Sequence, residues 1–150
     1  MQKITPFLWI NANLKEVMEY YTSIFKNSKI TSAHEMGDGS FMTASIELEG
    51  QHLMLLNGGQ FELNDSFSLF VRCETQQEVD YYWSSLTANG GSESMCGWLK
   101  DKYGLSWQII PNVLMELMSA GGEGSKRVMQ DMMQMHKIEI SKLEEAYNAK

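Results

Sequence analysis

The chain has 150 residues and a mass of 17.1 kDa, which suits one ordinary domain or two small fused modules. A hydrophobic content of 43% and a charged content of 21% exclude a disordered chain. A net charge of −7 argues against nucleic acid as a partner, since phosphate binding needs a basic face.

Neither a bilayer-spanning apolar run nor a secretion leader is visible, so we expect a cytoplasmic protein that does not contact a membrane. The two cysteines, Cys73 and Cys96, stand alone without Cys-x-x-Cys spacing. We interpret them as reduced, buried thiols of a cytosolic protein rather than as a disulfide or a metal pair.

The first half predicts a strand, a helix and three further strands. An apolar and aromatic stretch indicates a strand over 3–10, and Asn13 with Glu16 forms a capping box that begins a helix. Three more strands are predicted over 29–35, 41–49 and 51–57, joined by tight glycine-containing turns. The helix presents one apolar face, made of Leu14, Val17, Met18, Tyr21, Ile24 and Phe25.

The second half repeats this order. A strand is predicted over 66–73, and Thr75 with Glu78 forms a second capping box at an offset of 62 residues from Asn13. The constant offset indicates an internal duplication. Further strands are predicted over 92–96 and 105–110, with the turn 101–104 between them and the middle strand of this module left open. The second helix has its own apolar face, made of Val79, Tyr82, Trp83 and Leu86.

The last part of the chain predicts helices alone. The first starts at Pro111 and stops at Gly121-Gly122, the second covers 125–137, and Ser141 with Glu144 caps a third. The second helix places Val128, Met129, Met132, Met133 and His136 on one face. That methionine-rich face serves either as a binding surface or for packing against the domain or a partner subunit.

Several stretches resemble one protein family. They are 56–59, 77–83, the sixteen-residue block from Cys96 to Pro111 with two tryptophans, and 132–138. The chain is similar to the PhnB-like, 3-demethylubiquinone-9 3-methyltransferase-type family of the vicinal oxygen chelate superfamily, which includes glyoxalases, bleomycin-resistance proteins and extradiol dioxygenases. The resemblance covers nearly the whole chain.

The resemblance implies an α+β fold of paired βαβββ modules. In such a fold a curled mixed sheet forms a cup that holds a small ligand. We place the whole of 1–150 in one domain, with module one at about 1–60, module two at about 65–111 and a helical tail at 112–150. Relatives commonly pair, so a homodimer is also expected.

Metal-using relatives coordinate a divalent ion with His or Glu side chains from two strands of each module. The corresponding positions here fall near Thr5, at Leu53 or Met54, at Ser68 and at Gln108. These are poor ligands for a divalent ion, so we predict no metal site and no cofactor. His52 is the one candidate metal ligand, because it lies in the predicted strand that carries the second of these positions. Glu35, Glu47 and Glu74 are the carboxylates that could assist it, although nothing in their spacing converges on a common point.

Alternation in the predicted strands divides the candidate ligand residues between two faces. Thr5, Phe7 and Trp9 are assigned to the cup, whereas Ile4, Leu8 and Ile10 are assigned to the helix-covered face. Ser68, Phe70, Arg72 and Gln108 complete the cup, and Trp107 is assigned to the covered side. Gln108 either orients a polar ligand group or closes the end of the sheet, and for the aromatic residues packing within the sheet remains the alternative role.

Together these features predict a small-molecule-binding protein of the glyoxalase/dioxygenase superfamily, acting by sequestration, by sensing or with side chains alone. One alternative is a metal-dependent lyase, isomerase or dioxygenase that uses His52. A weaker alternative is the 3-demethylubiquinone 3-methyltransferase that the family label asserts. Glycine clusters occur at 58–59 and 121–124, and neither is predicted to follow a parallel strand as a nucleotide-type methyl donor would require.

Overall fold

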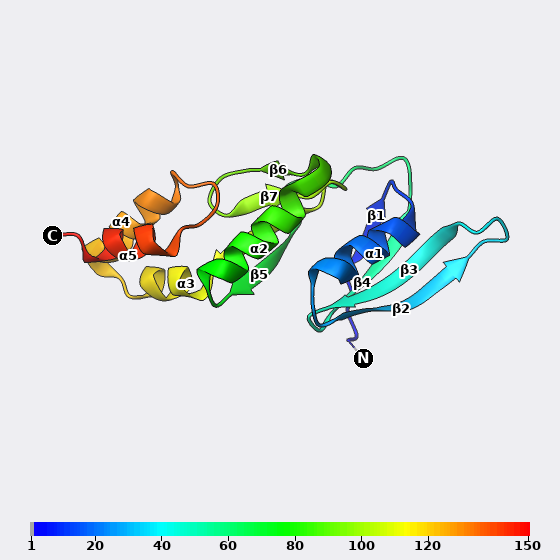
Figure 1. Cartoon of the computed structure of the whole chain (residues 1–150), viewed down its shortest axis with the longest axis horizontal. Helices are drawn as coiled ribbons and strands as arrows, with labels where there is room; N and C mark the ends of the chain where they lie inside the picture. The colour runs from blue at the N-terminus through cyan, green and yellow to red at the C-terminus, as the bar shows by residue number, and fades with distance from the viewer. Residues whose placement is uncertain (1) are drawn as a thin grey trace. The chain divides into compact units, whose positions relative to one another are not determined.

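The computed structural model describes residues 2–150, which form two compact units divided between Leu63 and Asn64. Each unit contains a four-stranded mixed sheet with one helix across one of its faces (Figure 1). The expected α+β class with two strand-helix-three-strand modules and C-terminal helices is confirmed. Within the described residues, no helix has the length and apolarity needed to cross a membrane.

In the first unit the strand order is β1-β4-β3-β2, with β1 parallel to β4 and the other pairs antiparallel. The predicted strands β2 to β4 are confirmed to within one residue at each end. The elements are β1 (Phe7–Ile10), α1 (Leu14–Ile24), β2 (Ser28–Glu35), β3 (Phe41–Leu48) and β4 (Gln51–Asn57).

Helix α1 begins where the capping residue predicted it. The Asn13 Oδ1 atom accepts hydrogen bonds from the backbone N–H groups of Lys15 and Glu16, at 3.0 and 3.4 Å. The six residues of its predicted apolar face are at most 6% exposed. They pack on one face of the sheet, which contributes Leu8, Ile10, Ala44, Ile46, Leu48, Leu53 and Leu55 to the same core.

The first strand is shorter than predicted. It starts at Phe7 rather than at Lys3, and Ile4, which we assigned to the helix-covered face, is 87% exposed. The physical reason is Pro6, which has no N–H to donate to a neighbouring strand. Its carbonyl still accepts a hydrogen bond from the Met54 N–H at 2.9 Å, and the regular pairing begins one residue later.

The second unit repeats the first in element order and in sheet order. Its order is β5-β8-β7-β6, again with the first and last strands of the module parallel. Helix α2 begins 62 residues after α1, and the Thr75 hydroxyl accepts a hydrogen bond from the Glu78 N–H, so the predicted duplication is confirmed. The elements are β5 (Ser68–Cys73), α2 (Gln76–Thr87), η1 (Ala88–Gly90), β6 (Ser92–Glu93), β7 (Trp98–Lys100) and β8 (Ser106–Pro111).

The prediction was wrong for the strand over 92–96. Strand β6 ends at Glu93, and the chain turns before it resumes as β7, the strand whose position the sequence left open. Cys96 and Gly97 have φ angles of 58° and 82°, which lie in the left-handed region and interrupt the strand. The turn is closed by hydrogen bonds between the backbones of Ser94 and Trp98 and of Trp98 and Met95.

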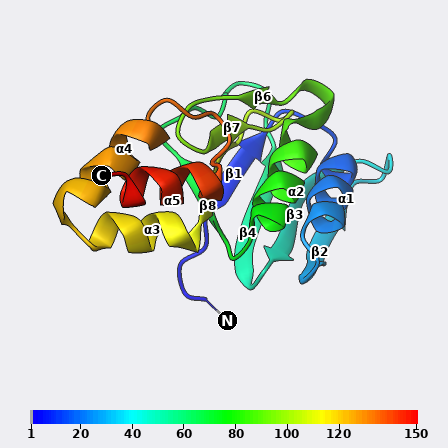
Figure 2. The same ribbon diagram turned by 60° about the vertical axis from the view of Figure 1, so that its left-hand side comes forward.

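Three helices follow β8 and lie together in Figure 2. They are α3 (Asn112–Ser119), α4 (Gly122–Met132) and α5 (Ile140–Asn148). Their core belongs to the second unit, because Ile110 at the end of β8 is part of it. The buried members of this core are Ile110, Leu114, Val128, Met135, Ile138, Leu143 and Ala146.

The second tail helix differs from the prediction. It ends at Met132 rather than at Lys137, since the carbonyls of Met135 and His136 accept hydrogen bonds from the N–H groups of Cys96 and Gly97, both at 2.8 Å. His136 therefore lies outside the helix. Met129 and Met133 are 46% and 57% exposed, so the predicted methionine face is only partly buried.

The start of the last helix was also predicted wrongly. Helix α5 begins at Ile140, and the cap comes from the distant Gln76 rather than from Ser141. The Gln76 side chain accepts a hydrogen bond from the Ile140 N–H at 2.8 Å and donates one to the Ile138 carbonyl at 3.0 Å. The Lys137 ammonium, 2.6 Å from Asp80, and the Gln76 amide lower the pKa of the Asp80 carboxyl. Helix α2 thus anchors the tail.

Candidate functional site

Each sheet has a face away from its helix, which we call its open face. On the first sheet the open face is defined by the residues that alternate with the buried core positions, and the cross-strand registers place them together. Its aromatic residues are half exposed, at 45% for Phe7 and 41% for Trp9. The face comprises Phe7, Trp9, Thr43, Ser45, Glu47, His52, Met54 and Leu56.

The predicted ligand residues of strand β1 lie on or beside this face. Phe7 pairs with Met54, and Trp9 packs edge-on against Phe61 with ring centroids 5.2 Å apart. Thr5 is half-buried and precedes the strand. The two aromatic residues therefore share one face of their own unit, as predicted, while Thr5 lies outside the sheet.

The structure shows which of Leu53 and Met54 occupies the suspected metal-ligand position on β4. Leu53 is 1% exposed under the helix, whereas Met54 is 39% exposed on the open face, so Met54 is the residue at that position. A thioether is a poor ligand for hard or borderline divalent ions, which prefer oxygen and nitrogen donors. The chemistry of the residues present does not fit the metal centre of the superfamily.

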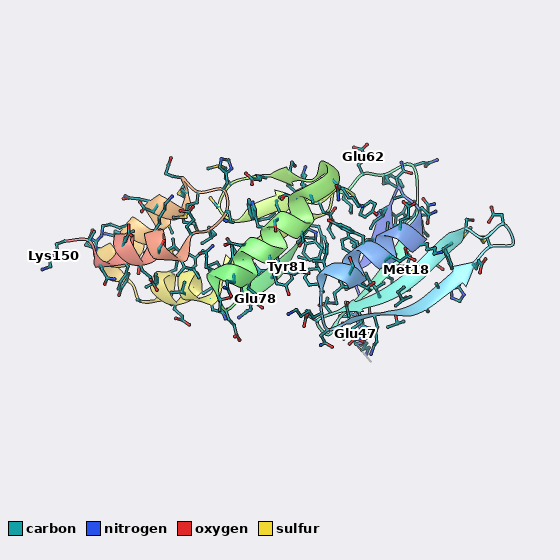
Figure 3. All side chains as sticks on the ribbon, in the orientation of Figure 1. Met18, Glu47, Glu62, Glu78, Tyr81 and Lys150 are labelled. Atoms are coloured by element: carbon teal, nitrogen blue, oxygen red, sulfur yellow. The ribbon has the colours of Figure 1, made fainter. Side chains whose placement is uncertain are left out.

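His52 has a partner that the sequence did not reveal. It lies opposite Glu47, and its Nε2 atom is 3.3 Å from the Glu47 Oε2 atom; Figure 3 labels Glu47. The Lys29 ammonium lies at the same distance from that oxygen. Glu47 is thus shared by two basic side chains, and within residues 2–150 no group of three or more His, Cys, Asp or Glu side chains could hold a metal ion.

The second sheet has an open face of different character. The registers place Ser68 opposite Ser106 and Phe70 opposite Gln108, and on the other side of β8 they place Lys100 opposite Ser106. The Gln108 Nε2 atom donates a hydrogen bond to the Ser68 hydroxyl at 3.0 Å. This face comprises Ser68, Phe70, Arg72, Trp98, Lys100, Ser106 and Gln108.

The predicted ligand residues of this unit therefore share one face. Phe70 is 43% exposed beside the Ser68–Gln108 pair, and Arg72 is exposed two residues further along β5. Among the described residues the Arg72 guanidinium has no ion-pair or hydrogen-bond partner. The face thus offers an aromatic surface, an amide-hydroxyl pair and a cation to a ligand.

Trp107 lies on the opposite face of β8, as predicted. It is 2% exposed, and its Nε1 atom donates a hydrogen bond to the Asp101 Oδ2 atom at 2.8 Å. The other Asp101 oxygen accepts hydrogen bonds from the N–H groups of Tyr103 and Leu105, at 2.8 and 3.1 Å. This buried carboxylate connects the turn between β7 and β8 to the core.

Three residues of the second open face were not predicted as site residues, namely Trp98, Lys100 and Ser106. Alternation back from Gln108 would have indicated Ser106. Trp98 and Lys100 could not be found in this way, since they lie on β7, the strand that the sequence did not predict.

Both cysteines are free, but only Cys73 is buried; Cys96 is half-buried, so the prediction of a buried thiol was wrong for it. Burial in β5 raises the pKa of the Cys73 thiol to about 12, and the nearby Glu78 carboxylate adds to the shift. Cys73 is therefore a packing residue and not a nucleophile.

The glycines at 58–59 follow a strand that has a parallel neighbour, because β4 is parallel to β1. Our prediction that neither glycine cluster does so was wrong. Gly58 nevertheless has a packing role, as a Cβ atom there would lie 2.6 Å from the Trp9 ring. The segment after it leads to β5 and not into a helix, so it lacks the strand-turn-helix geometry of a nucleotide site.

A family model and one solved structure indicate the same family. The sequence model described as 3-demethylubiquinone-9 3-methyltransferase matches residues 2–110. The match stops short of the tail segment 132–138, so it is less extensive than the resemblance we inferred. A comparison with curated proteins gave no match.

Solved structures of similar fold include a putative 3-demethylubiquinone-9 3-methyltransferase, PhnB protein, from Bacillus cereus. It is 33% identical with a TM-score of 0.67, and the alignment covers 73% of this chain and 99% of that one. Protein PA1353 from Pseudomonas aeruginosa is 17% identical with a TM-score of 0.58, covering 74% and 98% of the two chains. The fosfomycin resistance protein FosX from Listeria monocytogenes is 14% identical with a TM-score of 0.59, covering 77% and 94%.

Proposed function

This chain belongs to the 3-demethylubiquinone-9 3-methyltransferase family, a PhnB-like branch of the vicinal oxygen chelate superfamily, and from that premise we propose that it binds a small molecule without a metal ion. The proposed site is the open face of the second sheet. The observation that best supports this proposal is the hydrogen bond between Gln108 and Ser68 beside the half-exposed Phe70 ring.

This arrangement suits a ligand that combines an apolar or aromatic body with a polar group. Such sites pair aromatic walls with a few polar groups that fix the ligand's orientation. The Arg72 guanidinium, which has no partner among residues 2–150, adds a charge that a carboxylate or phosphate of the ligand would neutralise. Within the first unit, Phe7 and Trp9 form a separate apolar surface on that unit's own open face, with Thr5 beside it.

Replacing Gln108 by Leu is expected to weaken the binding of a polar compound found by a thermal-shift screen. A hydrogen bond between a pocket group and a ligand contributes about 0.5–1.5 kcal/mol, so the dissociation constant should rise roughly three- to tenfold. Calorimetric titration of the purified variant measures this change. Gln130→Leu, at an exposed position of α4, is the matched control and should bind normally; equal affinity in all three proteins would remove Gln108 from the site.

Added Mn²⁺, Ni²⁺, Zn²⁺ or Fe²⁺ is expected to raise the melting temperature by no more than about 1 °C. The residues at the suspected ligand positions, including Met54, Ser68 and Gln108, are poor donors for these ions. A tight ion at one hundred times its dissociation constant would add about 2.7 kcal/mol, which a melt would show clearly.

The alternative that this experiment addresses is a metal-dependent lyase, isomerase or dioxygenase. The contact between His52 and Glu47 favours it, since both are potential ligands. A large metal-induced rise that His52→Ala abolishes would establish this alternative. The methyl transfer in the family's name is a weaker candidate, because the glycines at 58–59 are not followed by a helix.

We also propose that the protein is a homodimer whose tail contributes to the interface. The apolar stripe of the tail is buried in its own unit, but Met115, Met129 and Met133 are 50%, 46% and 57% exposed. Exposed side chains of this size are typical of subunit contacts.

Truncation after Pro111 is expected to give insoluble or monomeric protein, since it also uncovers Ile110. Replacing the three exposed methionines by Gln leaves the buried tail core intact and should yield a folded monomer in sedimentation velocity. A folded dimer in both variants would show that the tail does not hold the pair.

A further inference from the structure

One buried polar atom of the second unit has no hydrogen-bond partner among residues 2–150. The Ser106 side chain is 1% exposed, and its hydroxyl makes no hydrogen bond with any residue in the described part of the chain. A buried hydroxyl left unpaired costs free energy, so such atoms usually have a partner, often a bound molecule.

Ser106 lines a hollow that contains other polar groups. The hollow measures about 210 Å³, and Asp65, Ser92 and Lys100 are among its lining residues. The registers bring three of these residues together, because Lys100 lies opposite Ser106 on one side and opposite Ser92 on the other, and Asp65 joins them through its ion pair with Lys100. Serines of two strands therefore lie on either side of Lys100 in the sheet, beside a space several times the size of a water molecule.

The described lining of the hollow carries one cation and two carboxylates, Asp65 and Glu93, and both carboxylates already have a partner. Lys100 is its one cation among the described lining residues, and the Lys100 Nζ atom is 2.7 Å from the Asp65 Oδ1 atom. That pair is solvent-exposed, with Asp65 at 72%, and exposed pairs are weak. The second carboxylate, that of Glu93, accepts a hydrogen bond from the Trp83 Nε1 atom. The Asp65 carboxylate is thus positioned as an exchangeable partner of the ammonium.

We infer that this hollow binds a small oxyanion, of the carboxylate or phosphate type. The oxyanion replaces Asp65 as the partner of Lys100 and accepts hydrogen bonds from the Ser106 and Ser92 hydroxyls. Such charge-assisted bonds are stronger than bonds between neutral groups. The inference rests on the proposed function and extends it, since it gives the chemical class of one part of a ligand bound to the same open face.

Titration with inorganic phosphate at constant ionic strength, followed by ¹H–¹⁵N correlation spectra, tests this inference. Saturable shifts are expected at the amides of Lys100 and Ser106. Lys100→Gln should abolish them, and Asp65→Asn should lower the apparent dissociation constant because it removes the competing carboxylate. Lys142→Gln, which alters another exposed ion-paired lysine, is the control and should bind as the wild type does. No saturable shift in the wild type, or unchanged shifts in Lys100→Gln, would overturn the inference.

Ser106→Ala gives a readout that separates binding from folding. It removes a hydroxyl that has no partner among residues 2–150, so the melting temperature without phosphate should not fall, while phosphate affinity should drop roughly three- to tenfold. Unchanged phosphate affinity would exclude the hydroxyl from the site. A parallel titration with acetate distinguishes the carboxylate class from the phosphate class. The anion that saturates the shifts at the lower concentration belongs to the preferred class.

The experiments distinguish a failure of the oxyanion site from a failure of the proposed small-molecule function. A screened compound that shifts Phe70 and Gln108 while phosphate shifts nothing would refute the oxyanion site and leave the proposed function standing. Saturable phosphate binding at Lys100 without any compound acting at Gln108 would support the oxyanion site and count against the wider open-face proposal.

Discussion

Replacing Trp107 by Ala is expected to lower the free energy of unfolding by about 3–5 kcal/mol. The side chain is 2% exposed on the covered face of β8, so its removal empties a core site and also breaks its hydrogen bond to Asp101. Urea unfolding followed by far-ultraviolet circular dichroism measures the loss.

Trp9→Ala is the matched control, because this tryptophan is also on a sheet but is 41% exposed on an open face. Its loss of stability should be clearly smaller. If Trp107→Ala keeps full stability and instead abolishes ligand binding, the two faces of β8 have been assigned the wrong way round.

Replacing Asp101 by Ala is expected to destabilise the protein by about 3–5 kcal/mol, because three donors lose their acceptor and two of them are buried. Asp101→Asn should cost less. It retains one carbonyl oxygen for the backbone N–H groups of the turn, but it places an amide N–H₂ against the Trp107 N–H. Urea unfolding of the wild type, Asp101→Asn and Asp101→Ala checks the role of the carboxylate, and the free energy of unfolding should fall in that order.

A matched aspartate is available in the first unit. Asp38 also accepts hydrogen bonds within a turn, from the Ser40 N–H and hydroxyl, but the residue is exposed. Water replaces those bonds when the side chain is removed, so Asp38→Ala should change stability little. An effect of Asp38→Ala as large as that of Asp101→Ala would contradict the explanation by burial.

Features coded by local sequence could be predicted well. The capping residues Asn13 and Thr75 located both helix starts, and their shared offset revealed the duplication before any contact was known. Alternation along β8 correctly separated Trp107 from Gln108. Such signals need only a few neighbouring residues, and they determine most of the fold.

Features that depend on distant residues could not be predicted. Helix α5 is capped by Gln76, which precedes it by 64 residues, and no local pattern indicates that bond. Strand β7 was left open because the left-handed backbone at Cys96 is unusual for a residue with a side chain. The contact between His52 and Glu47 depends on the register between two strands.

Some residues of the candidate site could also be predicted from the sequence, whereas others were found only in the structure. Alternation along β5 placed Ser68, Phe70 and Arg72 on one face, and the family resemblance added Gln108 to it. The register that sets Phe70 opposite Gln108, and the hydrogen bond between Gln108 and Ser68, required the structure. Lys100 and Ser106, which line the hollow, were missed because one lies on the strand that was left open and the other differs little from an ordinary strand serine.

The central claim is that a small molecule binds the open face of the second sheet without a metal ion. The most direct test maps ¹H–¹⁵N shifts in protein stripped of metal, using the compound with the largest effect in a thermal-shift screen. We predict that the largest shifts fall at Ser68, Phe70 and Arg72 and at the backbone and side-chain amides of Gln108. Shifts confined to residues off this face, or shifts that appear only after a divalent ion is added, would contradict the claim.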